Sequence, residues 1–191
     1  MKRNRNIVKL AIVSSLAAFI ALNASESFAA GAHGGGHGNF TTIGKAGKVS
    51  DVTRTVKVVM QDNFFELENL SIKGGETIRF VIKNAGEFVH EFNIGTKAMH
   101  GEHFKEMTKM MEHGVLEPDK INRDKMKMDM GNGKTMQHND PNSVLLEPGK
   151  STEIIWKFPG KAIAQLEFAC NIPGHYDAGM MGKVRFLKST S

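Results

Sequence analysis

The sequence contains very little cysteine, tryptophan and tyrosine, with one residue of each among 191. A single Cys excludes an internal disulfide framework, and it also excludes any zinc site that needs two or more thiolates. Five Pro and 20 Gly occur without a collagen-like repeat, and charges of both signs run through the chain. An ordinary globular class with one packed core therefore remains.

Much of the formal net charge of +5 lies in the first 29 residues of the chain. The first residues combine a basic start, an apolar run from Leu10 to Leu22, and small residues that allow cleavage after Ala29. These are the three parts of a secretory signal. The run is too short for a bilayer, which takes about 20 apolar residues. We expect residues 1–29 to be removed on export to the periplasm; the alternative is an uncleaved membrane anchor.

Loss of residues 1–29 changes the partners that the sequence predicts. It removes four basic residues and one acidic residue, which leaves a net charge of about +2. No basic run survives to bind nucleic acid, and we expect no stable membrane insertion after cleavage.

The rest of the chain divides into a leader and one domain. Residues 30–47 begin with a Gly- and His-rich stretch without apolar periodicity, which predicts a flexible segment. Short runs of alternating apolar and polar residues follow, separated by Gly and Pro turns. They predict an all-β antiparallel sandwich or barrel over residues 48–191. An insertion at about 96–143 interrupts the strands.

Part of the insertion has the periodicity of a helix. The helix is expected from Gly101 to Gly114, with Phe104, Met107 and Met111 as an apolar stripe against the β-domain.

One His and the lone Cys fall on the apolar faces of expected strands. His90 alternates with Phe92 and Ile94, and Cys170 follows Phe168 at the same spacing. A buried imidazole needs a partner. An unpaired Cys outside the cytoplasm has three interpretations: an intermolecular disulfide, an inert core residue, or a metal ligand.

The residues after Cys170 favour a metal ligand. His175 and Met180 follow at equal spacing, and Gly174 and Gly179 allow the intervening loop to bend. With the His of the distant strand, the set becomes two His, one Cys and one Met. Such a set selects copper, because thiolate and thioether are soft and imidazole suits copper. Metal binding also explains how the thiolate persists unpaired.

These motifs resemble those of the cupredoxins, the family of plastocyanin, azurin and rusticyanin. The resemblance rests on Cys170-x4-His175-x4-Met180 with Phe88-Val89-His90 and Lys73–Phe80, and it covers residues from about 49 to 187. It implies a Greek-key β-sandwich or barrel around one type 1 (blue) copper. It also implies that His90, Cys170 and His175 are the equatorial ligands and that Met180 is the axial ligand.

Two residues limit what the resemblance implies. Many cupredoxins have Asn or Ser after the first His ligand, whereas this chain has Glu91, so the surroundings of the metal and its redox potential do not carry over. Met181 is a second thioether beside Met180. We prefer Met180 because its spacing is similar to that in rusticyanin, but both remain open.

Soft ligands are more numerous than one copper needs. Eight of the 12 Met lie in the insertion. They are either core filler or an accessory Cu(I) site, and the run Met126-Lys127-Met128-Asp129-Met130 favours the second. His33 and His37 either capture Cu(II) or are incidental. The remaining insertion residues of these two types are Met99, Met107, Met110, Met111, Met136, His100, His103, His113 and His138.

Two functions fit these residues. The first is copper handling or resistance in the periplasm, which the insertion favours and which exported copper-resistance cupredoxins with a similar insertion support by resemblance. The second is single-electron transfer between redox proteins. Besides copper itself, the partner we expect is a redox or copper-transfer protein. An enzyme is not expected, because the chain has one domain, no second Cys and no His-x-His pair for further copper sites.

Overall fold

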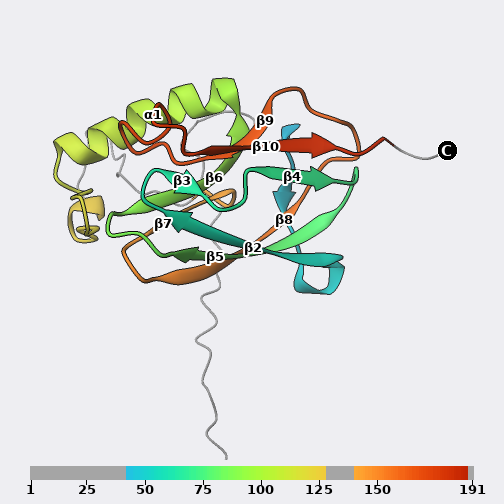
Figure 1. Cartoon of the computed structure of the whole chain (residues 1–191), viewed down its shortest axis with the longest axis horizontal. Helices are drawn as coiled ribbons and strands as arrows, with labels where there is room; N and C mark the ends of the chain where they lie inside the picture. Colours follow the sequence, from blue (N-terminus) through green and yellow to red (C-terminus); the bar gives the residue numbers. More distant parts are fainter. Residues whose placement is uncertain (1–41, 128–139, 189–191) are drawn as a thin grey trace, which may run out of the picture. The chain divides into compact units, whose positions relative to one another are not determined.

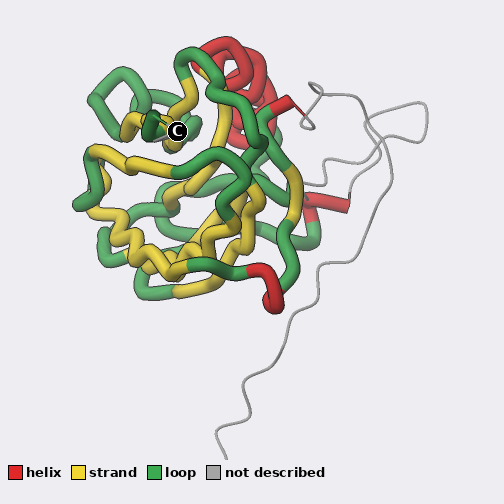
Figure 2. Tube along the Cα trace, turned by 90° about the vertical axis from the view of Figure 1, so that its right-hand side faces the viewer, coloured by secondary structure: helices red, strands yellow, loops and turns green. Residues whose placement is uncertain are grey.

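Two five-stranded sheets form the domain in the computed structural model, which describes residues 42–127 and 140–188 (Figures 1 and 2). The strands are β1 (Lys45–Ala46), β2 (Arg54–Gln61), β3 (Phe64–Phe65), β4 (Asn69–Ile72), β5 (Thr77–Asn84), β6 (His90–Thr96), β7 (Ser143–Leu146), β8 (Ser151–Lys157), β9 (Leu166–Ala169) and β10 (Met181–Phe186). Helix α1 spans Lys97–Glu112, and short 3-10 helices span Val49–Asp51 (η2) and Lys125–Lys127 (η3).

The sheets have the orders β1-β8-β5-β2-β3 and β4-β10-β9-β6-β7. The predicted β-sandwich is confirmed, but the prediction of purely antiparallel pairing is wrong. The pairs β2/β5 and β4/β10 are parallel, and the other pairs are antiparallel. The chain leaves one sheet, forms strands in the other and returns, so neighbours separated by such an excursion can run in the same direction.

The core lies between the two sheets and is rich in aromatic rings. Phe80 of β5 meets Phe92 of β6 at a centroid distance of 5.3 Å, and Phe92 meets Phe168 of β9 at 5.6 Å. Trp156 of β8 is also fully buried. These side chains occupy alternate strand positions, as the sequence predicts, so the two sheets are held by large apolar surfaces facing each other.

The ordered domain begins before the expected start at residue 48. Ile43 is fully buried, Trp156 Nε1 donates to the Ile43 carbonyl at 3.3 Å, and β1 pairs with β8. The last residues of the expected flexible segment therefore belong to the packed domain. The expected signal peptide and the His33 and His37 tail lie outside the described residues.

Helix α1 begins earlier than expected and turns a different face to the protein. It starts at Lys97 because Thr96 caps it, with the Thr96 hydroxyl accepting from the Met99 N–H at 3.3 Å. The predicted stripe is correct only at Met107. Met110 is also buried, whereas Phe104 and Met111 are 38% and 42% exposed.

The buried face of α1 covers the outer side of the sheet β4-β10-β9-β6-β7, where α1 packs against β6 and β9 (Figure 1). Glu91, Asn93 and Glu167 occupy the positions of β6 and β9 that alternate with core residues, and all three are buried. Strand alternation alone would have placed these polar side chains in solvent. Among the described residues, no helix is long and apolar enough to cross a membrane.

The corrected helix face predicts different costs for two Met substitutions. Met107→Ala removes a fully buried side chain and should lower the free energy of unfolding by about 2–5 kcal/mol. Met111→Ala, one turn on, is the matched control and should cost less than about 0.5 kcal/mol. Urea unfolding of the metal-free protein measures both values. Equal costs would contradict the assigned face.

Candidate metal centre

Hydrogen bonds from distant segments shape the loop that leads to His90. The Asn84 side chain is buried and donates to the carbonyls of Phe88 at 2.7 Å and Leu146 at 2.8 Å. The Asp62 carboxylate accepts from the backbone N–H groups of Glu87 and Phe88. The loop therefore enters β6 with His90 on the inner face, where it is fully buried.

The second segment is a loop that closes on itself between Cys170 and Met180. The Cys170 N–H donates to the Met180 carbonyl at 3.1 Å, and the Met180 N–H donates to the His175 carbonyl at 3.0 Å. Gly174 and Gly179 have φ angles of +89° and +100°, which side chains with a Cβ rarely adopt. The expected bends are therefore present, and they return the chain to its starting point.

The two segments bring three of the predicted ligands together. His90 Nδ1 lies 3.2 Å from His175 Nδ1, and Cys170 Sγ lies 3.3 Å from His175 Nδ1. A first-row metal ion about 2.0–2.1 Å from nitrogen and about 2.3 Å from sulfur holds neighbouring ligand atoms about 3–4 Å apart. The spacing and the donor types therefore fit one copper ion.

No other group of three His, Cys, Asp or Glu with ligand atoms this close occurs in the part of the chain that the structure describes.

The pKa values in the metal-free site favour neutral groups. Burial and the nearby Glu91 carboxylate raise the pKa of the Cys170 thiol to about 12. Burial and the neighbouring His90 lower the pKa of His175 to about 4, and burial also lowers the pKa of His90. At neutral pH the site therefore offers two neutral imidazoles and a thiol that must lose its proton to bind a metal ion.

Asp62 is a site residue that the sequence did not reveal. Its Oδ1 lies 2.9 Å from His90 Nε2, the ring nitrogen that faces away from His175. A carboxylate at this nitrogen fixes the tautomer and orientation of the ring and leaves Nδ1 free to bind metal. Asp62 lies in the β2–β3 turn, 28 residues before His90, so no local pattern links the two.

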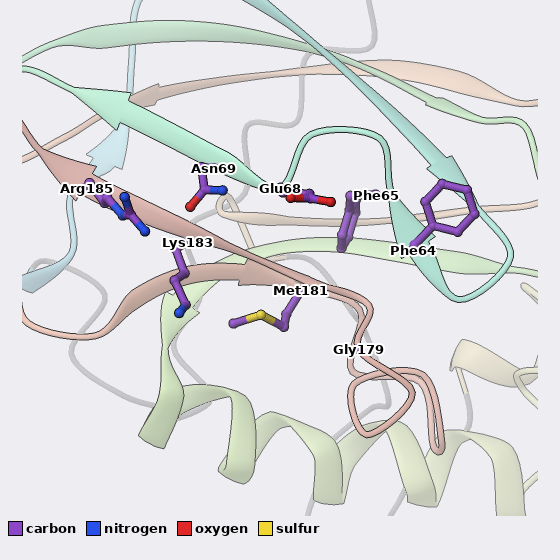
Figure 3. Close-up of a pocket in the computed structure, with 8 residues that line it drawn as sticks. All are labelled: Phe64, Phe65, Glu68, Asn69, Gly179, Met181, Lys183 and Arg185. Atoms are coloured by element: carbon purple, nitrogen blue, oxygen red, sulfur yellow. The ribbon is translucent and has the colours of Figure 1, made fainter.

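The two candidate thioethers point to opposite sides of β10. Met180 is fully buried and packs in the core, directly before the strand. Met181 lines a hollow of about 480 Å³ on the outer side, beside Lys183 (Figure 3). Met180 as the axial ligand stays a prediction.

The Met and His residues of the insertion that the structure describes differ in burial. Met107, Met110 and His100 are buried, Met99 and Met126 are half-buried against the core, and Met111 and His113 are exposed. His103 contacts the buried Glu91. The Met residues of the helix thus act mainly as packing residues. This agrees with the interpretation as core filler rather than as an accessory Cu(I) site. Met128, Met130, Met136 and His138 lie outside the described residues.

Known proteins are similar to this chain in sequence. A family described as "Copper binding proteins, plastocyanin/azurin family" matches residues 52–186. A copper-resistant cuproprotein CopI of Pseudomonas aeruginosa is 48% identical over 148 residues, covering 74% of this chain and 81% of the relative. Another, from Rubrivivax gelatinosus, is 40% identical over 156 residues, covering 80% and 79%.

Solved structures with low sequence identity share the fold. Auracyanin B has a TM-score of 0.52 at 18% identity, covering 76% of this chain and 96% of its own. Dithionite-reduced auracyanin from Roseiflexus castenholzii has a TM-score of 0.50 at 20% identity, covering 72% and 99%.

The pKa values of the site predict how copper binding depends on pH. Because Cys170 is a thiol and both His are neutral at pH 7, binding of one Cu(II) should release about one proton. The affinity should rise about tenfold per pH unit between about pH 6 and 8, since the competing proton becomes scarcer. Calorimetry in buffers of different ionisation enthalpy measures the release. Cys170→Ser should release none, and release of two or more protons by the unaltered protein would contradict the assignment.

Proposed function

The chain belongs to the plastocyanin/azurin family of copper-binding proteins, and we propose that it handles copper in the periplasm as a copper-resistance protein. One blue copper site is proposed at His90, Cys170, His175 and Met180. The observation that carries the proposal is the convergence of His90 Nδ1, Cys170 Sγ and His175 Nδ1 beneath the closed loop. Sequence identity to copper-resistant cuproproteins supports resistance rather than another use of the same site.

The protein residues have separate tasks at this site. Bound copper supplies one-electron redox chemistry. Cys170, fully buried, offers a sulfur atom shielded from water and from other thiols. His90 is held at its far nitrogen by Asp62. His175 is half-buried and is the proposed route between the site and an electron- or copper-transfer partner.

The signal-like sequence of residues 1–29 supports the proposed periplasmic location. Residues 1–29 have the basic, apolar and small-residue parts of a signal peptide, and the chain then has one Cys that needs protection from oxidation. We include residues 1–29 as a cleaved signal in the proposal. In an oxidising compartment, a thiolate that is bound to copper is better protected from oxidation than an exposed free thiol.

The accessory copper site is proposed for the end of the insertion rather than for α1. Met107 and Met110 contribute to the core, so their thioethers are committed to packing. Met126 is half-buried against the core, but it and the following Met128 and Met130 alternate with charged residues, which is unusual for core filler. Thioethers need no deprotonation and prefer Cu(I), so this run is the proposed secondary site, with His33 and His37 as a Cu(II) site.

Single-electron transfer between redox proteins remains the second candidate function. The half-buried His175 at the edge of the site favours it, because an exposed ligand edge shortens the path to a partner. Catalytic turnover is not part of either proposal.

The visible spectrum tests the proposed site. Addition of Cu(II) should produce an intense blue or green absorption, which arises from a Cys thiolate bound to copper. Cys170→Ala should abolish it, because the chain has one Cys. A protein that binds Cu(II) tightly but stays colourless would refute the site.

Copper stoichiometry separates copper handling from electron transfer. The variant with Met126, Met128 and Met130 changed to Leu should bind less Cu(I) than the unaltered protein, while the Cu(II) absorption of the central site is unchanged. Cells that carry the variant should tolerate less copper. Equal Cu(I) stoichiometry and unchanged tolerance would rule out the accessory site and favour electron transfer.

A further inference from the structure

Glu91 is a buried carboxylate that lies beside the metal centre and is bound from several elements. Its side chain is fully buried on the outer face of β6, under α1. Its Oε2 accepts from Asn171, through the backbone N–H at 3.1 Å and the side-chain amide at 2.8 Å. Its Oε1 accepts from the Ser143 hydroxyl at 2.6 Å and lies 2.8 Å from His103 Nε2. One carboxylate thus links β6, β7, the segment after β9, and α1.

The same residue contacts the metal centre through its backbone. The Glu91 N–H donates to Cys170 Sγ at 3.3 Å. Glu91 directly follows His90, and Asn171 directly follows Cys170. The carboxylate therefore fixes the neighbours of two proposed ligands, and its backbone supplies a hydrogen bond to the sulfur. Hydrogen bonds at a Cys sulfur are one of the factors that set the redox potential of a blue copper site.

His103 is the residue of α1 that completes this arrangement. Its Nδ1 lies 3.3 Å from Glu106 Oε2, one turn further along the helix, so the ring is held with Nε2 towards Glu91. Both ring nitrogens face carboxylate oxygens, and a His with two such acceptors carries both protons and a positive charge. That positive charge lies beside the buried Glu91 carboxylate and stabilises it.

The electrostatics of His103 agree with this geometry. Burial lowers the pKa of His103, but the field of Glu91 and the hydrogen bonds to Glu106 and Glu91 outweigh it and raise the pKa to about 10. The imidazolium is therefore the form present at neutral pH.

We propose that α1 is a structural part of the metal centre, in which His103 acts through Glu91 as a positioning residue for Cys170. The inference rests on the proposed copper site. It assigns to the insertion a second role, separate from the binding of additional copper: the docked helix sets the position of the Glu91 N–H against the sulfur and thereby tunes the copper site.

The test compares His103→Ala with His113→Ala in the full-length copper-loaded protein. His113 is the matched control, because it caps the same helix but is exposed and its ring contacts the Lys109 carbonyl. His103→Ala removes one positive charge from beside Glu91, which favours Cu(II) over Cu(I). We expect the ratio of the two affinities to change at least threefold, a fall in potential of about 28 mV at 59 mV per tenfold. The thiolate absorption should also shift in wavelength or intensity.

A rescue variant separates positioning from a loss of packing. His103→Gln keeps a neutral N–H donor on a side chain of similar reach, so it should restore the absorption of the unaltered protein more fully than His103→Ala does. If His103→Ala does not fold, His103→Gln and Glu91→Gln take its place. His103→Gln removes the imidazolium charge and should lower the potential relative to His113→Ala, whereas Glu91→Gln removes the carboxylate charge and should raise it.

Two results have different meanings. An unaltered protein without thiolate absorption would refute the proposed copper site itself. An unaltered protein with normal absorption, together with a potential and a spectrum in the His103 and Glu91 variants equal to those of His113→Ala, would overturn the role of α1.

Discussion

Burial of β6 and β9 on both faces is the constraint on which the rest of this structure depends. Their inner faces carry part of the aromatic core and the proposed ligand His90, and the proposed ligand Cys170 directly follows β9. Their outer faces carry polar residues that need partners once α1 excludes water from them. At Glu91 the helix supplies His103 as a partner, so the packing of the insertion and the chemistry of the site are parts of one arrangement.

Features that depend on neighbours in sequence could be predicted from the sequence. Alternation along each strand identified the sandwich, and the equal spacing of Cys170, His175 and Met180 identified the ligand loop. Asp62 could not be found, because its contact with His90 joins the β2–β3 turn to a strand 28 residues away. The prediction of the buried face of α1 was partly wrong, because helical spacing permits two overlapping apolar stripes. Packing against the sheet determines which of the two is buried.

The methionines of the insertion divide into two groups with different physical roles. Those in α1 that are buried fill the irregular space between helix and sheet, a task that suits a flexible unbranched side chain. Met126, Met128 and Met130 are the group that the proposed Cu(I) site requires. A high count of Met is therefore weak support for copper binding unless packing is considered first, and the spacing among charged residues is the more specific signal.

The hydrogen bond between Asp62 and His90 has a consequence for the proposed copper site. Because the far side of the imidazole is anchored in the fold, the ring has its binding orientation before any metal arrives. The closed loop from Cys170 to Met180 restrains the other side chains in the same way. A metal site whose ligands are positioned during folding changes little between two oxidation states, so electron exchange at the proposed copper would need little nuclear reorganisation.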